Sequence, residues 1–475
     1  MIGLQIHPIT LFLATIGIAI FIILRVHQWI KLKEMPVLPP VVRKQSPCSF
    51  SSNLRLKPSE FLKECQIKYG DVFTLEMDGG KNMTYVFDPN NFKQILTTFD
   101  FFTISKQSKQ RFKLNKILEY LPRITTELKK SLSSKILNPA LHRFQKHFDS
   151  TVKDMQTPSE YTSGVNIGLL EFVETFIVPK LLYTLFGPSI YYKGFSDDFR
   201  TFNKAMATRN TGSDGKLASF GEKAEENLRN AVCTMLKDQT PTDFVKSVQE
   251  GALRSLVLDE EELTNFFLML LWASLINLRP TTFWMIAHIA REPNALQTIK
   301  EEAETASEEL DIFQIRNMKK TWSIINEVFR VQSRPNMYRY SLKDTVIKVK
   351  GGTTFLIPKG NWVALFPKLM HMDKNVYKDA HKFKYNRFPV DTTLSSVYRT
   401  PLVFGMGMGM CPAQDYTYFI LAIIAIKVFS TFNIDLVGDL PTADENTVAS
   451  TPPPLNDVTA IIKLKPLVRN DYQNK

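Results

Sequence analysis

The chain has 475 residues, of which 44% are hydrophobic and 22% are charged. A chain of this length and composition buries a large core, which excludes a largely disordered protein. The formal net charge of +12 suits an anionic membrane, an acidic protein partner or nucleic acid. No basic run interleaved with aromatic residues occurs, so we expect no nucleic-acid partner.

Four cysteines are spread widely along the chain, at Cys48, Cys65, Cys233 and Cys411. No CxxC pair occurs, which argues against a structural zinc site and against a disulfide framework. The cysteine usage therefore fits a reducing compartment.

The N-terminal segment from Met1 to Leu24 carries no charged side chain and is followed at once by Arg25. Its length reaches the roughly 20 apolar residues that a membrane helix needs. The basic residues after it favour a cytosolic location for the rest of the chain. A cleaved signal peptide is the alternative, which the missing basic start and cleavage site disfavour. We expect a single-pass anchor at residues 1–30 and a proline-rich linker at 31–50.

Residues 51–475 are expected to form one domain that is mainly α with a minor β region. Helical patterns predict helices at Pro58–Tyr69, Leu128–Met155, Val165–Leu185 and about Pro412–Phe429. Runs rich in β-forming residues predict strands at Asp71–Met77, Thr84–Phe87, Thr345–Lys350, Thr354–Ile357 and Trp362–Phe366.

The longest helical pattern runs from about Glu260 to Arg291, and acidic residues open it, as suits a helix N-terminus. Its apolar middle, Phe266–Leu278, is short for a membrane span and ends at Arg279 and Pro280. We therefore predict a helix that is buried in the core.

Pro280 should kink this helix, because it cannot donate a hydrogen bond to the carbonyl of Ile276. The kink opens a polar notch in an apolar wall, and Asn277 lies on the same side one turn earlier. A notch that holds one amide could seat O₂, water or a peroxide. The alternative is a packing kink with no further role.

Glu327 and Arg330 are three residues apart, share one helix face and can form an ion pair. Arg387, in the run Phe383–Phe388, could complete a buried network of one carboxylate and two guanidinium groups. The alternatives are a solvated surface pair and an ordinary basic loop.

Cys411 follows three glycines in the run Phe404–Ala413, and a helix is expected after it. Glycine permits positive φ and lets the backbone approach a bulky ligand closely. Pro412 suits the first turn of a helix, which places Cys411 at a helix N-terminus, where the dipole favours a thiolate. Backbone N–H groups of the turn can also point at the sulfur. A flexible loop with an incidental cysteine is the alternative.

The order of these motifs resembles the cytochrome P-450 family: a helix notch, E-x-x-R, F-x-x-x-R-F and F-G-x-G-x-x-x-C near the C-terminus. The resemblance covers essentially the whole chain. The stretch Leu271–Trp284, with Asn277 and Pro280, is similar to the group of sterol 7α-hydroxylases, sterol 12α-hydroxylases and prostacyclin synthase. Pro453–Asp457 resembles the sterol 7α-hydroxylases, and Cys411-Pro412-Ala413 is most similar to the oxysterol 7α-hydroxylase branch.

The resemblance implies the cytochrome P-450 fold and makes residues 51–475 a haem-thiolate catalytic domain. It implies haem b (iron protoporphyrin IX) with Cys411 as the axial metal ligand. Asn277 and Pro280 would be catalytic residues. The remaining cofactor-binding residues would be Phe404, Gly405, Arg339, Glu327, Arg330 and Arg387. The resemblance also implies five substrate-contacting ranges, whose bounds are approximate. They are Phe101–Phe112, 185–215, Leu275–Pro280, Ser333–Tyr338 and Ser450–Pro453.

The chain departs from the family pattern at several positions. Gly409 stands where an arginine is common, and no tryptophan between Trp29 and Trp272 supplies the usual Trp-x-x-x-Arg clamp. His142 or Arg143 could substitute for that clamp. Arg279 is an unusual charge beside the notch, but helical spacing turns it about 100° from Pro280, so we expect it to point elsewhere.

Three functions are compatible with these residues. The first is a sterol or oxysterol hydroxylase that uses O₂ and electrons from NADPH-cytochrome reductase, anchored in the endoplasmic reticulum membrane. The second is a prostacyclin-synthase-like isomerase of a lipid peroxide, which needs no reductase. The third is a haem- or lipid-binding relative without turnover. The motif Pro453–Asp457 and the residues around Cys411 favour the hydroxylase.

Overall fold

The computed structural model describes residues 36–43, 57–77, 81–98, 101–102, 121–155, 160–208, 215–252, 258–388, 401–445 and 450–466, with Arg25 and Leu54. The predicted membrane anchor at residues 1–30 lies outside these residues, apart from Arg25.

Helices make up most of the described chain. In chain order they are α3 (Pro58–Tyr69), α4 (Phe92–Thr97), α7 (Leu121–Ser131), α8 (Ser134–Asp154), α9 (Glu160–Ser163), α10 (Leu169–Phe172), α11 (Val178–Phe186), α12 (Phe195–Thr208), α13 (Gly215–Leu236), α14 (Asp243–Ser247), α15 (Glu260–Ile276), α16 (Leu278–Arg291), α17 (Pro293–Glu304), α18 (Ile312–Asn317), α19 (Lys319–Gln332), α20 (Lys368–His371) and α21 (Gln414–Thr431). Short 3-10 turns are η1 (Pro89–Asn91), η3 (Pro188–Ile190) and η5 (Gly407–Gly409), and π-helical segments are η2 (Val173–Ile177) and η4 (Val248–Ala252).

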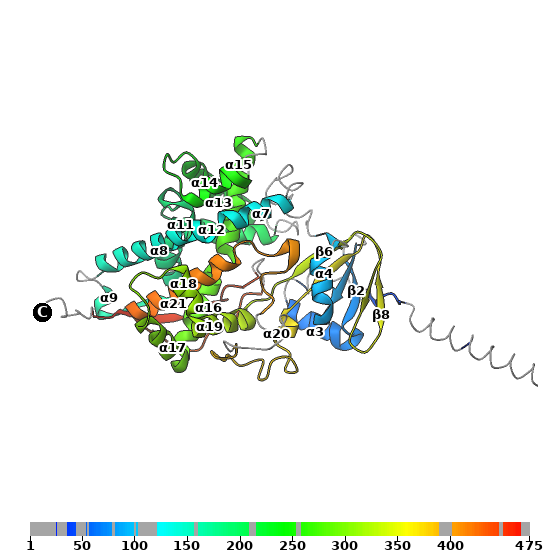
Figure 1. The fold of residues 1–475 in the computed structure, drawn as a ribbon. Helices are drawn as coiled ribbons and strands as arrows, with labels where there is room; N and C mark the ends of the chain where they lie inside the picture. The colour runs from blue at the N-terminus through cyan, green and yellow to red at the C-terminus, as the bar shows by residue number, and fades with distance from the viewer. Residues whose placement is uncertain are drawn as a thin grey trace, which may run out of the picture.

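The strands form three sheets. The six-stranded sheet has the order β1-β2-β3-β9-β6-β4, with β1 (Val41–Val42), β2 (Val72–Met77), β3 (Lys81–Val86), β9 (Trp362–Leu365), β6 (Met337–Ser341) and β4 (Phe101–Phe102). An antiparallel three-stranded sheet has the order β10 (Phe432–Leu436), β11 (Thr459–Leu464) and β5 (Val165–Gly168), and β7 (Thr345–Lys348) pairs with β8 (Thr354–Ile357). Figure 1 shows the helices gathered on one side of the molecule and a smaller β-rich part, with α3 and α4, on the other.

The expectation of a mainly α chain with a minor β region is confirmed. Two expectations need correction. The helix expected at 128–155 is two helices, α7 and α8, which are separated at Leu132 and Ser133. Residues 165–168 are not helical, because they pair as β5 with β11. Within the expected linker at 31–50, Val41 and Val42 pair as β1 with β2.

The helix expected from Glu260 to Arg291 begins with a capping box between Asp259 and Glu262. It is interrupted at Asn277, which separates α15 from α16. Among the described residues, this stretch alone is long and apolar enough to cross a membrane, yet 67% of its most apolar window is buried in the protein. Burial on this scale fits the predicted core helix.

The core packs α8, α11, α15, α16, α19 and α21 around one another. Most of α21 from Tyr416 to Phe429 is buried, as expected of a helix that is apolar all round. This helix begins at Gln414, two residues later than expected. Cys411 therefore lies in the turn before the helix.

The motif Pro453–Asp457 has a visible structural role at its last residue. The Asp457 carboxylate accepts hydrogen bonds from the backbone N–H groups of Leu170 (2.8 Å) and Glu171 (3.1 Å), at the start of α10. Gly168, the N-cap residue, has no side chain of its own to cap this helix. A Cβ on Gly168 would lie 2.2 Å from the Asp457 Oδ2 atom, so only glycine leaves room for this remote cap.

We predict that Asp457→Ala lowers the free energy of unfolding by about 1–2 kcal/mol, the usual cost of losing a helix cap. Gly168→Ala should also destabilise the protein, because the new methyl group displaces the carboxylate. The double variant should be no less stable than Asp457→Ala alone, since the carboxylate that clashes is then absent. Denaturant titration measures all three, with the exposed Asp439→Ala as control, and additive losses would contradict the prediction.

Candidate functional site

The loop that carries Cys411 is folded back on itself by backbone hydrogen bonds. The Cys411 N–H donates to the carbonyl of Phe404 at 2.8 Å. The Phe404 ring packs edge-on against Phe329 of α19, with ring centroids 5.2 Å apart, and against Tyr418 of α21. Through Phe404, the loop is therefore fixed to two core helices, α19 and α21.

Two glycines of this loop occupy positions that other residues would fill badly. Gly405 and Gly407 have φ values of +74° and +62°, in the left-handed region. A Cβ on Gly405 would lie 2.9 Å from the Gly409 carbonyl oxygen, and one on Gly407 would lie 2.6 Å from the carbonyl oxygen of Leu96 in α4. The glycines thus let the loop pass close to its own backbone and to α4.

The Cys411 side chain is a free thiol. Burial raises its pKa, while a hydrogen bond from the Ala413 backbone N–H and the positive charge of Lys129 act in the opposite direction. This N–H is the kind of donor expected from a turn before a helix, and it stabilises negative charge on sulfur. The turn can therefore stabilise a Cys411 thiolate when a cation takes the place of the thiol proton.

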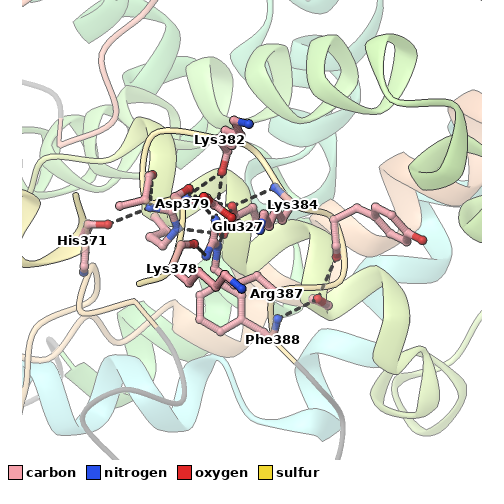
Figure 2. Close-up of polar contacts among 12 residues, drawn as sticks. Glu327, His371, Lys378, Asp379, Lys382, Lys384, Arg387 and Phe388 are labelled. Carbon is pink, nitrogen blue, oxygen red and sulfur yellow. Dashed lines mark hydrogen bonds and ion pairs between the residues drawn. The ribbon is translucent and has the colours of Figure 1, made fainter. Parts of the chain in front are cut away.

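Glu327, Arg330 and Arg387 lie together in one network, as Figure 2 shows for Glu327 and Arg387. The Glu327 carboxylate accepts two hydrogen bonds from Arg330, at 2.8 Å each, and its two oxygens share the Arg387 Nε–H at 2.9 Å. The Lys384 backbone N–H donates to the same carboxylate at 2.9 Å. Glu327 and Arg330 are fully buried, so the network is not the solvated surface pair that we considered.

The two guanidinium groups also bind backbone carbonyls of the segment before Phe388. Arg330 donates to the carbonyls of His371 (2.7 Å) and Ala380 (2.6 Å). Arg387 donates to the carbonyls of Lys378, Asp379 and Lys382 (Figure 2). The network therefore ties α19 to the whole segment from 371 to 388.

His371 connects this segment to the cysteine loop, a role that our sequence analysis missed. Its Nε2 accepts a hydrogen bond from the Leu402 N–H at 3.1 Å, two residues before Phe404. Burial holds the pKa of His371 well below its ordinary value, so the ring stays neutral and can accept. In the sequence, His371 is recognisable only as a histidine that precedes the run containing Arg387.

Arg339 is buried at 4% exposure in β6, and burial lowers its pKa to about 10. In the described part of the chain its hydrogen-bond acceptors are the carbonyls of Tyr338 (2.9 Å) and Met406 (3.5 Å), with no carboxylate among them. Met406 belongs to the cysteine loop. The structure thus holds an unbalanced buried cation beside that loop.

The helix break at Asn277 has the physical cause that we predicted. Pro280 has no N–H to donate to the Ile276 carbonyl. The Asn277 carbonyl accepts from the Thr281 N–H (3.0 Å) and the Thr281 hydroxyl (2.7 Å), so regular helical bonding resumes one residue later. The Asn277 side-chain oxygen accepts from the backbone N–H groups of Ser450 (2.8 Å) and Thr451 (3.2 Å). No local pattern predicts this contact, because its partners lie 173 and 174 residues apart.

Arg279 points away from Asn277, as its helical spacing indicates. It forms a buried ion pair with Glu174 of η2, and Arg200 of α12 lies 3.1 Å from the same carboxylate. Arg279 also lies over the ring of Phe199. The apolar run before α11 contains two acidic residues, Glu171 and Glu174, and the sequence does not indicate which of them pairs with Arg279.

The residues suggested in place of the missing clamp have other partners. His142 lies 3.4 Å from the Glu309 carboxylate, and Arg143 binds the Thr184 carbonyl and Asp243. Of the predicted substrate-contacting ranges, 103–112 and 209–214 lie outside the described residues.

Comparisons with known proteins place this chain among characterised relatives. The family model described as "Cytochrome P450" matches residues 195–460. The chain is 24% identical to a rabbit (Oryctolagus cuniculus) protein named 7-alpha-hydroxycholest-4-en-3-one 12-alpha-hydroxylase, covering 92% of this chain and 95% of the relative. It is 25% identical to cholesterol 7-alpha-monooxygenase of Cricetulus griseus, covering 88% and 91%.

Among solved structures, the chain resembles the retinoic acid-bound cyanobacterial CYP120A1 with a TM-score of 0.75. The match covers 91% of this chain and 100% of that structure, at 16% sequence identity. At this identity the likeness concerns the fold alone.

We predict that acid destabilises the protein through His288 of α16. Its ring stacks on Phe383 at 4.3 Å and its Nε2 accepts from the Gln332 amide nitrogen at 2.9 Å. Burial lowers the pKa of His288 from 6.5 to about 4. A depressed folded-state pKa means that the stabilisation is complete above pH 6.5 and is lost as the pH falls towards 4.

At pH 5, protonation linked to His288 should have lowered the protein's free energy of unfolding by about 2 kcal/mol. This pH lies about 1.5 units below the ordinary histidine pKa, and each unit contributes about 1.4 kcal/mol. His288→Phe keeps a ring against Phe383 but takes up no proton, so it should lose about 2 kcal/mol less than the unmodified chain between pH 7 and 5. Denaturant titrations at both pH values measure the difference, with the exposed His381→Gln as control. Equal losses in His288→Phe and the unmodified chain would contradict the prediction.

Proposed function

The chain belongs to the cytochrome P450 family, and we propose that it is a haem-thiolate monooxygenase that hydroxylates a sterol or an oxysterol. As a member of this family it is an enzyme, and a haem cofactor is implied. The observation that carries the proposal is the Cys411 thiol, fixed in a glycine loop beside the unbalanced cation of Arg339.

The residues present fit a haem. The Cys411 sulfur accepts a hydrogen bond from the Ala413 N–H. Gly405 and Gly407 let the loop lie close to its own backbone and to that of α4. Arg339 is a buried cation without a carboxylate among the described residues, and the propionate of a haem b would balance it. We propose Cys411 as the metal ligand, with Phe404, Gly405 and Arg339 as further haem-binding residues. The network of Glu327, Arg330 and Arg387 would hold this loop in position through His371, which binds Leu402.

When bound, the haem would supply an iron that activates O₂ with electrons from a reductase. Cys411 would hold the iron and donate electron density to it through the sulfur. The Ala413 N–H would keep negative charge on that sulfur, and Arg339 would neutralise a propionate. Asn277 and Pro280 are the residues that we propose for the opposite wall, where the helix break interrupts the apolar surface of α15 and α16.

The proposal of a sterol substrate is supported by the relatives of this chain. Both of the relatives described above are named for the hydroxylation of a sterol, and each aligns over most of its length. They are named for different positions, C12 and C7, so we propose the substrate class and not the carbon. The similarity of Cys411-Pro412-Ala413 to the oxysterol branch adds oxysterols to that class.

We further propose an acidic NADPH-cytochrome reductase as the electron donor and the endoplasmic reticulum membrane as the location. The net charge of +12 suits an acidic partner. The uncharged segment from Met1 to Leu24 would serve as a single-pass anchor, with the catalytic domain in the cytosol.

The experiment uses the purified full-length haem protein with a panel of sterols and oxysterols and with a lipid endoperoxide, each with and without reductase and NADPH. We expect a hydroxylated sterol only in the arms that contain the reductase. A product from the endoperoxide without reductase would favour the isomerase instead. A normal thiolate spectrum with no product in any arm would favour a relative without turnover.

Cys411→Ser should abolish the thiolate signature in the spectrum of the reduced carbon monoxide complex, because a neutral hydroxyl replaces the ligand sulfur. The matched control is Cys233→Ser, whose sulfur contacts the Thr264 hydroxyl of α15 and lies outside the loop. That variant should keep the signature. A Cys411→Ser protein that kept it would overturn the assignment of the metal ligand.

A further inference from the structure

The segment Ser450–Pro453 is held at the helix break by two side chains of the helix stretch α15–α16. The Asn277 Oδ1 atom accepts from the backbone N–H groups of Ser450 (2.8 Å) and Thr451 (3.2 Å). One turn of helix beyond Pro280, the Trp284 Nε1–H donates to the Pro452 carbonyl at 2.8 Å. Both residues belong to the helix stretch around the notch, and both bind the same short loop.

The residues after α19 hold the other side of this loop. The Ser333 and Thr451 hydroxyls are 2.8 Å apart and both are buried. The Arg334 N–H donates to the Ser450 carbonyl at 2.7 Å. The loop therefore bridges the helix break and the segment that leads into β6, where Arg339 reaches the cysteine loop.

The sequence of the loop makes Asn277 its principal backbone partner. Residues 452, 453 and 454 are prolines, so Ser450 and Thr451 carry the only backbone N–H groups between 450 and 454. Asn277 accepts both of them. Since both partners are N–H donors, the carboxamide oxygen must face the loop, which fixes the orientation of the whole planar group.

We propose that Asn277 is a positioning residue, whose side-chain oxygen fixes the loop Ser450–Pro453 against the helix break, with Trp284 as the second point of attachment. The oxygen of Asn277 is thereby occupied by the loop and is not the group that meets O₂. The effect on catalysis rests on the proposed function: a loop that bridges the notch and the Arg339 segment forms part of the wall against which a sterol is oriented.

Hydrogen–deuterium exchange of a peptide that spans Ser450–Pro454 tests the contact directly, because only two backbone amides can report from it. Asn277→Ala removes the acceptor, and exchange of these amides should rise by about tenfold or more. Asn277→Asp keeps an oxygen acceptor of the same shape, so protection should return to within about threefold of the unmodified chain. Ser274→Ala is the matched control, since in the described part of the chain the Ser274 hydroxyl donates to the Leu271 carbonyl of its own helix.

Trp284→Phe gives a second variant that keeps an aromatic ring but lacks the N–H group. It should raise exchange in the same peptide by a smaller factor than Asn277→Ala. Unchanged exchange in both Asn277→Ala and Trp284→Phe would overturn the proposal, whether or not the protein hydroxylates a sterol.

Turnover provides the functional readout, as the distribution of products over the sterol carbons. Asn277→Ala should scatter the site of attack, and Asn277→Asp should restore the original pattern, because the loop is again held. An Asn277→Asp protein that has restored protection but the product pattern of Asn277→Ala would show that the amide N–H acts on the reactants, and would overturn the positioning role. If no sterol is converted in any variant, the proposed function fails while the exchange result still decides the contact.

Discussion

One buried carboxylate sets the position of the rest of the site. Glu327 is fully buried, and its two oxygens receive hydrogen bonds from Arg330, Arg387 and the Lys384 backbone. A buried charge of this kind is tolerated only when every member of the network is bonded. The segment from 371 to 388 must therefore fold over α19. In that position, the His371 ring accepts a hydrogen bond from the Leu402 N–H, in the loop that ends at Cys411.

The other contacts at the site also join segments that are far apart in the chain. Asn277 binds the loop after residue 449, Asp457 caps a helix that begins at Leu169, and Glu174 neutralises Arg279. Glu174 and Arg279 are both buried and satisfy each other across two elements. The Asp457 cap lies at the surface, where it joins the C-terminal loop to α10. The Asn277 contact joins the helix break to the C-terminal loop. His371 and Arg339 make the contacts to the cysteine loop.

Local patterns in the sequence predicted most of the elements and the residues of the network, but not the division between α7 and α8 or the strand β5. The spacing of Glu327 and Arg330 sufficed for that pair, because residues three apart share one helix face. The glycines before Cys411 are likewise a local pattern. Arg387 lies 60 residues from Glu327, and only the run around it suggested that it completes the network. Helical spacing also gave the direction of Arg279. The partners Ser450, Thr451, Glu174 and Leu170 could not be found in this way. They lie more than 100 residues from the groups they bind, and periodicity carries no information on which distant segments meet.

Hydrogen–deuterium exchange across residues 401–411 in a Glu327→Gln protein tests the central claim most directly. Glutamine keeps the shape but turns an N–H₂ group towards donors, so the bonds to Arg330 and Arg387 cannot all form. We predict that exchange in this loop rises by about tenfold or more, relative to the exposed Glu301→Gln control. Protection of residues 401–411 equal to that of the unmodified chain would contradict the claim that Glu327 fixes the cysteine loop.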